Sequence, residues 1–193
     1  MKRICVYCGS SPGRLPQYLD AARELGLALV ERDIGLVYGG ASVGIMGEIA
    51  DTVMSGGGDV VGVIPQALAE KEVSHPGLTE LKLVDSMHER KSVMAEMADG
   101  FIALPGGLGT IEELFEVLTW SQLGFHQKPC GLLNIEGYYD HLLHFMEHAV
   151  EQQFVKQQHR DMLLASGNAQ SLLEEMAVYT PPAIDKWIGR KQN

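Results

Sequence analysis

Three glycine-rich turns are the segments of this sequence best suited to hold an anion. They are Cys8–Ser11, Gly39–Gly47 and Pro105–Thr110, and each follows an apolar run and precedes a helical pattern. Glycine lets the backbone approach a ligand closely, and the following helix offers unpaired N–H groups and the positive end of its dipole. Taken alone, any one of these turns would more often be just a tight connection between a strand and a helix. Three at one sheet edge favour a phosphate site, with these candidate residues: Gly9, Ser10, Gly40 and Gly44.

The helix that follows the third turn carries two neighbouring acids with different surroundings. Glu112 shares a polar face with Glu116 and Thr119 at the i, i+4, i+7 spacing, whereas Glu113 shares its face with apolar residues. We therefore expect Glu113 to point toward the packed side, next to the glycine turn. The nearby helix N-terminus should favour its ionised form, suited to steering water or countering positive charge rather than donating a proton. The alternative is a helix acid that interacts only with the dipole.

Two cations, Arg90 and Lys91, form a second candidate group in the segment Met87–Lys91. Each shares a helical face with apolar residues, so each needs an anionic partner, which a phosphate or carboxylate of the site would supply. Arginine is better suited to two-pronged contact with an oxyanion. The alternative is a solvated helix end whose long side chains reach water. His88 is interpreted as structural rather than as a base.

No cofactor or metal is expected. None of the turns contains the Gly-Lys-Ser/Thr of a P-loop or the Gly-x-Gly-x-x-Gly dinucleotide fingerprint, which favours a nucleotide-like phosphate over ATP hydrolysis or NAD chemistry. A histidine stripe has the spacing of metal ligands without an obvious cysteine or acidic partner: His141, His144 and His148. Cys5 and Cys8 form a C-x-x-C, but they belong to a strand rather than to a helix N-terminus, so no redox pair is expected.

Short apolar runs alternate with helical patterns along the chain, which predicts a parallel sheet with right-handed crossovers. The runs are apolar on both sides, as in a sheet covered on both faces. The expected strands are Ile4–Cys8, Gly35–Tyr38, Val60–Ile64, Leu81–Val84, Phe101–Leu104 and Gly131–Asn134. The expected helices are one around Tyr18–Leu29, then Gly44–Met54, Met87–Ala98, Thr110–Leu123, Tyr138–Gln152 and Ala169–Met176. We predict one doubly wound α/β domain over residues 1–193, with a tail from about Tyr179 and a short segment, Ile184–Trp187, packed on the body or on a partner subunit.

Composition excludes several classes of function. The 193 residues are 46% hydrophobic and 21% charged, typical of a globular domain with a substantial core. No apolar run reaches the ~18 residues of a membrane span, and no export signal is recognised, so no membrane partner is expected. The three cysteines favour a reducing cytoplasm. A net charge of −10 argues against nucleic-acid binding but leaves room for a small anion at a local site.

Four blocks of the sequence together resemble one family. The segment Pro105–Glu113 matches the PGGxGTxxE signature of the LOG ("lonely guy") family, the cytokinin riboside 5'-monophosphate phosphoribohydrolases. The segments Met87–Lys91, ICVYCGSS and GGASVGIMG are similar to its other blocks, and the resemblance runs from about Lys2 to about Thr180. Many such sequences have carried the label lysine decarboxylase, but this chain has no obvious lysine context for pyridoxal phosphate.

The resemblance implies a hydrolase. Its reaction would cleave the N-glycosidic bond of N6-modified adenosine 5'-monophosphates, and several bacterial relatives also accept AMP. It implies a Rossmann-like three-layer sandwich, a homodimer whose site is completed at the interface, and Arg90 and Glu113 as the catalytic pair. The implied substrate contacts are Glu72, Arg90, Lys91, Gly106, Gly107, Leu108, Gly109, Thr110, Ile111, Glu112 and Thr119. The Glu72 segment departs from the family pattern.

Two other functions fit the same architecture. One is a non-catalytic carrier of a nucleotide or of the molybdenum cofactor, which needs no acid–arginine pair and would bind without cleavage. The presence of both Arg90 and Glu113 favours the enzyme. The other is a DNA-processing relative, which the net charge of −10 disfavours.

Overall fold

The structure is a computed structural model that describes residues 1–69 and 74–182. Its centre is one seven-stranded sheet in the order β4-β3-β2-β1-β5-β6-β7, and each neighbouring pair of strands is parallel. The strands are β1 (Arg3–Tyr7), β2 (Gly35–Tyr38), β3 (Val60–Pro65), β4 (Glu80–Val84), β5 (Gly100–Ala103), β6 (Cys130–Leu133) and β7 (Leu163–Ser166). The predicted doubly wound, mostly parallel α/β fold is confirmed.

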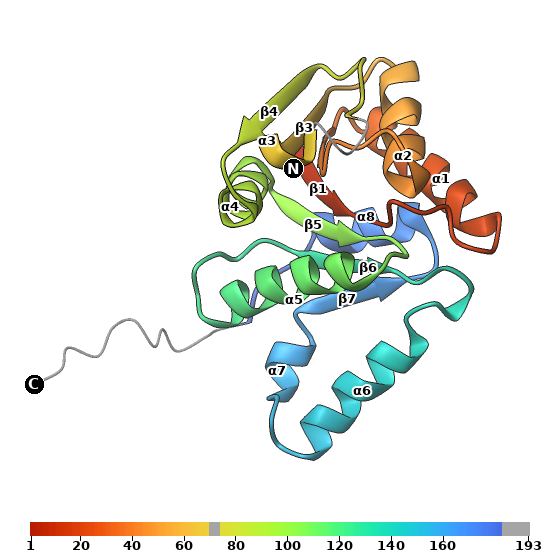
Figure 1. Ribbon diagram of the computed structural model, residues 1–193. Coiled ribbons are helices and arrows are strands. Elements are labelled where there is room, and N and C mark those ends of the chain that lie inside the picture. The colour runs from red at the N-terminus through yellow and green to blue at the C-terminus, as the bar shows by residue number, and fades with distance from the viewer. Residues whose placement is uncertain (70–73, 183–193) are drawn as a thin grey trace, which may run out of the picture.

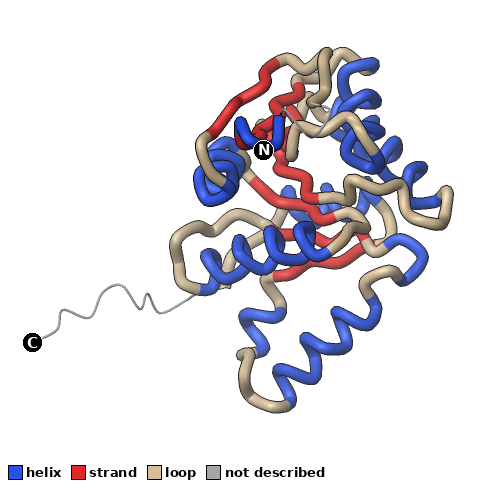
Figure 2. The backbone as a smooth tube through the Cα atoms, viewed as in Figure 1, coloured by secondary structure: helices blue, strands red, loops and turns tan. Residues whose placement is uncertain are grey.

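Helices cover both faces of the sheet (Figure 1). They are α1 (Gln17–Glu31), α2 (Gly44–Ser55), α3 (Gln66–Ala69), α4 (Met87–Met97), α5 (Leu108–Gln122), α6 (Asp140–Glu151), α7 (Gln157–Arg160) and α8 (Ala169–Ala177). Helices α1, α2 and α8 pack on one face, and α4, α5 and α6 pack on the other. In Figure 2 the strands form a single twisted layer among these helices. None of the described helices has the length and apolar character of a membrane span.

Strand β1 shows why the strands appear in the sequence as continuous apolar runs. Ile4 and Val6 enter the core beneath α1, α2 and α8, whereas Cys5 and Tyr7 enter the core beneath α4 and α5. Both faces of the strand are therefore buried, and alternation between polar and apolar residues is lost.

The strand order changes direction between β1 and β5. Helix α1, which follows β1, covers one face of the sheet, and α5, which follows β5, covers the other. The loops that leave the carboxyl ends of these two neighbouring strands therefore diverge, and they leave a crevice where ligands bind in open α/β sheets.

The expected elements differ from the observed ones in several places. Strand β7 was missed because it is a half-exposed edge strand without a fully apolar run. The short helices α3 and α7 were also missed. Helix α5 begins at Leu108, two residues before the expected Thr110. The expected helix Tyr138–Gln152 is α6, which begins two residues later at Asp140, and a 3-10 turn, Ile135–Gly137, precedes it, with Glu136 and Gly137 at left-handed φ angles of 51° and 67°. The expected segment Ile184–Trp187 lies outside the described residues.

Candidate functional site

The three glycine-rich turns meet at the carboxyl edge of β1. The Gly9 N–H donates to the Pro105 carbonyl at 3.1 Å, and the Met46 N–H donates to the Gly9 carbonyl at 3.3 Å. Gly44, at a φ of 61°, lies so close to Ser10 that a Cβ atom there would collide with the Ser10 carbonyl. The first turn is thus held between the other two, and the close backbone contacts explain why glycine stands at these positions.

A cavity of about 320 Å³ lies over these turns. It is lined by Gly9, Ser10, Ser11, Gly13, Tyr18, Ile45, Pro105, Gly106, Gly107 and Tyr138. Of the four predicted phosphate-loop residues, Gly9 and Ser10 line it, and Gly44 supports Ser10 from behind. Gly40 does not line it, because it packs against β3 and its carbonyl accepts the His75 N–H at 3.0 Å.

The third turn ends at the N-terminus of α5. Gly107 is the N-cap residue and offers no side-chain acceptor, so the first amides of the helix lack the usual capping partner. Thr110 is buried, whereas the Leu108 side chain is 89% exposed. This end of the helix therefore presents N–H groups and positive dipole potential next to the cavity, as an anion site requires.

The close packing around Gly106 predicts that a side chain at this position would destabilise the fold. A Cβ atom there would lie 2.9 Å from the Gly9 nitrogen and would collide with the Thr110 hydroxyl, whereas a Cβ atom at Gly109 would meet open space. We expect Gly106→Ala to separate the first and third turns and to lower the melting temperature by several degrees, an effect of about 1–3 kcal/mol. Gly109→Ala is the matched control and should leave the melting temperature unchanged or slightly higher. Equal melting temperatures for the two variants would contradict this account.

Arg90 and Glu113 form a buried pair between α4 and α5. The Arg90 Nη1 lies 3.7 Å from the Glu113 Oε1, and each side chain is 9% exposed. The Arg90 Nε donates to the Val63 carbonyl of β3 at 3.1 Å. The guanidinium also lies against the backbone of Gly39, where any Cβ atom would collide with it. The solvated-helix alternative for Arg90 is excluded by this burial.

Burial determines the ionisation of Glu113. It raises the pKa of this carboxyl, the Arg90 guanidinium opposes the rise, and the negative charge of Glu112 adds to it. The pKa therefore shifts in the direction opposite to the one expected from the helix N-terminus. Helix α5 begins at Leu108, which places Glu113 in the second turn, where the dipole has faded and desolvation dominates.

The raised pKa of Glu113 predicts an unusual pH dependence. If catalysis needs the ionised carboxylate, kcat/KM should fall toward acid with a midpoint above that of an ordinary glutamate, because the buried acid retains its proton to higher pH. By the same linkage, this group's contribution to stability is complete at low pH and is lost as pH rises through its raised pKa. The test is a pH–rate profile corrected for ionisation of the substrate phosphate. A midpoint at or below that of an exposed glutamate would contradict the prediction.

The anionic partners of Lys91 are two glutamates of the protein itself. Its Nζ donates to the Glu112 Oε1 at 2.7 Å and to the Glu116 Oε1 at 3.0 Å, and the bond to Glu112 raises the pKa of the lysine most. Lys91 is buried, so the solvated alternative is excluded here as well. Thr119 lies on the exposed side of α5, and its hydroxyl donates to the Phe115 carbonyl within the helix.

The remaining predicted residues occupy different positions. Ile111 packs partly buried against the core beneath α4 and α5, and Glu72 lies outside the described residues. His88 is exposed.

In the described part of the chain, no cluster of three histidine, cysteine or acidic side chains could hold a metal ion. Cys5 and Cys8 are free and buried, and burial raises the pKa of both thiols, which makes them poor nucleophiles.

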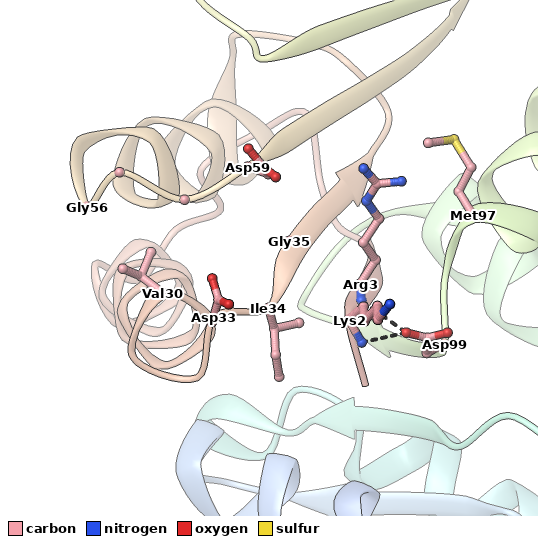
Figure 3. Close-up of a pocket in the computed structure, with 12 residues that line it drawn as sticks. Lys2, Arg3, Val30, Asp33, Ile34, Gly35, Gly56, Asp59, Met97 and Asp99 are labelled. Atoms are coloured by element: carbon pink, nitrogen blue, oxygen red, sulfur yellow. Dashed lines mark hydrogen bonds between the residues drawn. The ribbon is translucent and has the colours of Figure 1, made fainter.

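A larger cavity, of about 870 Å³, lies at the opposite edge of the sheet (Figure 3). Its lining includes the start of β1, and there Asp99 accepts hydrogen bonds from the Lys2 and Arg3 N–H groups at 2.5 and 3.1 Å. Neither Arg90 nor Glu113 lines it. Neither residue lines the smaller cavity over the glycine-rich turns, but Arg90 contacts the Val63 carbonyl and Gly39, near the carboxyl ends of β3 and β2.

Sequence reasoning placed Gly39 in a glycine-rich turn but missed its contact with Arg90, and it missed two tyrosines at this edge. Gly39 accommodates the Arg90 guanidinium, and the Tyr138 and Tyr139 hydroxyls bond to the carbonyl of Gly106 in the third turn and to that of Leu104 just before it. The two tyrosines follow Gly137 outside any recognised block, so only their position after a strand could have signalled a role.

The chain is similar to known proteins over most of its length. Residues 46–176 match a protein family described as "Possible lysine decarboxylase". A probable cytokinin riboside 5'-monophosphate phosphoribohydrolase of Oryza sativa subsp. japonica is 52% identical over 180 residues, which are 93% of this chain and 79% of the relative. A cytokinin riboside 5'-monophosphate phosphoribohydrolase of Arabidopsis thaliana is also 52% identical and covers 93% of this chain and 83% of its own length.

Solved structures share the fold at much lower identity. The molybdenum cofactor binding protein from Rippkaea orientalis superposes with a TM-score of 0.69 at 20% identity, over 92% of this chain and 96% of that one. The DNA processing protein A of Streptococcus pneumoniae gives a TM-score of 0.57 at 13% identity, over 91% and 62%. These likenesses describe architecture alone.

Proposed function

The chain belongs to the LOG family of cytokinin riboside 5'-monophosphate phosphoribohydrolases, and from this we propose that it is itself such a hydrolase. Its reaction adds water to the anomeric carbon of an N6-modified adenosine 5'-monophosphate and breaks the N-glycosidic bond. The products are the free base, which takes up a proton, and ribose 5-phosphate. AMP is the nearest second substrate.

The buried Arg90–Glu113 pair is the observation that carries this proposal. N-glycoside cleavage passes through a transition state with positive charge on the ribose, and a carboxylate beside that sugar stabilises the charge and orients water. Arg90 holds the carboxylate in place and favours its ionised form against the effect of burial. A carrier that only binds its ligand has no use for such a pair.

The glycine turns supply binding energy away from the bond that breaks. In our proposal the 5'-phosphate sits against the N-terminus of α5, whose first amides lack a side-chain cap. Anchoring the phosphate there places the anomeric carbon near Glu113, one and a half helical turns further along α5. Binding energy from a remote group then contributes to kcat/KM.

A substrate panel tests the proposal. Purified protein is incubated with isopentenyladenosine 5'-monophosphate, AMP, isopentenyladenosine and ATP, and the products are separated by chromatography. We expect base and ribose 5-phosphate from the monophosphates only. Release of no base from either monophosphate would overturn the proposal, and tight binding without cleavage would favour the carrier function. The molybdenum-cofactor proteins share the fold at about 20% identity, which gives that alternative little support.

We also propose that the working form is a cytoplasmic homodimer with the site near its interface. Leu108, at the N-terminus of α5, is 89% exposed, and Phe125, just beyond the other end of that helix, is 64% exposed. We place the contact with the second subunit at these exposed apolar side chains near the two ends of α5. Light scattering during gel filtration should give twice the mass of one chain, and a monomer would refute the dimer.

The free cysteines favour a reducing compartment, which cell fractionation can test.

A further inference from the structure

Two consecutive tyrosines bind backbone carbonyls in the third glycine-rich turn and just before it. The Tyr138 hydroxyl donates to the Gly106 carbonyl at 2.5 Å, and the Tyr139 hydroxyl donates to the Leu104 carbonyl at 2.7 Å. The carbonyl between them, that of Pro105, accepts the Gly9 N–H at 3.1 Å. Three successive carbonyls at the entrance to α5 are therefore each occupied by a donor from another part of the chain.

Fixing these carbonyls also fixes the amides that follow them. In a trans peptide the C=O of one residue and the N–H of the next lie in one plane and point in opposite directions. The bond from Tyr138 to the Gly106 carbonyl therefore directs the Gly107 N–H away from Tyr138. Because Gly106 and Gly107 have no side chains to restrict rotation, this hydroxyl is a main restraint on that peptide plane.

Local structure holds the tyrosine pair in place. The left-handed residues Glu136 and Gly137 turn the chain after β6, and the Tyr139 N–H donates to the Asn134 side chain at 2.7 Å. The Tyr138 ring packs edge-on against Tyr139, with ring centroids 4.8 Å apart. It packs in the same way against Tyr18 of α1, at 5.7 Å. These contacts fix the ring of Tyr138 independently of its hydroxyl.

We propose that Tyr138 is a positioning residue for the anion site. By holding the Gly106 carbonyl, its hydroxyl orients the N–H of Gly107, the N-cap residue of α5, toward the 5'-phosphate of the substrate. Tyr138 does not touch the bond that breaks, so its effect falls on phosphate binding. This inference rests on the proposed function, because it needs the phosphate to sit at the N-terminus of α5.

The test compares Tyr138→Phe with the wild type and with Tyr179→Phe. The first variant keeps the ring and its aromatic contacts and removes only the bond to Gly106. The second is a matched control, because the buried Tyr179 hydroxyl has no hydrogen-bond partner in the described part of the chain. Calorimetry measures the affinity for ribose 5-phosphate, kinetics give KM and kcat for the monophosphate, and competition gives the affinity for isopentenyladenosine, which lacks the phosphate.

We expect Tyr138→Phe to weaken ribose 5-phosphate binding by about 3- to 10-fold, the effect of one lost hydrogen bond. KM for the monophosphate should rise by a similar factor while kcat and the affinity for the nucleoside stay unchanged. Tyr179→Phe should match the wild type throughout. A merely structural role would instead weaken nucleoside and phosphate binding equally, and that result would overturn the inference.

The inference and the proposed function fail in different ways. A wild-type chain that binds no ribose 5-phosphate, or a Tyr138→Phe variant that binds it as tightly as wild type, refutes the positioning role. A wild-type chain that binds ribose 5-phosphate but releases no base refutes the proposed hydrolysis alone.

Discussion

Replacing Glu113 with glutamine should lower kcat by about 10³-fold or more, because it removes the negative charge that faces the developing cation. Glutamine has nearly the same shape, and its amide oxygen can take the place of the carboxylate oxygen that faces Arg90 in the buried contact. The fold should therefore survive, with a melting temperature close to that of the wild type. Initial rates of base release from isopentenyladenosine 5'-monophosphate measure the effect.

An exposed acid provides the control for this substitution. Glu174 on α8 is 75% exposed and far in sequence from the site, so Glu174→Gln should retain wild-type turnover. Unchanged turnover in Glu113→Gln would remove this carboxylate from the mechanism. Loss of turnover together with unfolding would show that its role is structural, and circular dichroism and thermal denaturation distinguish these outcomes.

Replacing Arg90 with methionine should abolish most activity and also destabilise the protein. The substitution leaves the Val63 carbonyl without its donor and Glu113 as an unpaired buried acid. Breaking a buried ion pair by removing one partner costs about 3–5 kcal/mol. The pKa of Glu113 should rise further, because Arg90 is the main group that opposes the effect of burial. Urea denaturation and base-release assays measure the two effects.

A double variant separates the stability loss from the loss of activity. Adding Glu113→Gln to Arg90→Met removes the stranded acid, so the double variant should be more stable than Arg90→Met alone and equally inactive. Arg90→Lys should restore little activity, because one ammonium group cannot bond to the Val63 carbonyl and face Glu113 as the guanidinium does. Strictly additive stabilities would show that the two side chains do not interact.

Local sequence patterns predicted a large part of this site. The spacing of apolar residues in α5 placed Glu113 on its inner side and Glu112 on its outer side, and both positions are confirmed. Helical periodicity is a property of a short segment, so it can be recognised without knowing the rest of the fold. The fold class followed in the same way, from strands whose two faces are both apolar.

Partners from distant segments could not be predicted in this way. The sequence showed that Arg90 and Lys91 each needed an anion, but it did not distinguish the two partners. The structure pairs Lys91 with Glu112 and Glu116, and it leaves Arg90 beside Glu113. The choice depends on where α4 and α5 lie relative to each other on the same face of the sheet, and no local pattern specifies that placement.

The sequence by itself therefore determined the class of the fold, the three glycine turns and the inward direction of Glu113. These features arise from backbone freedom and periodicity, which neighbouring residues along the chain set. Only the tertiary structure decided the raised pKa of Glu113, the Arg90 contact and the tyrosine hydroxyls on the third turn. Desolvation and hydrogen-bond pairing depend on which distant residues exclude water from one another, and that is fixed only when the sheet and its two helical layers have assembled.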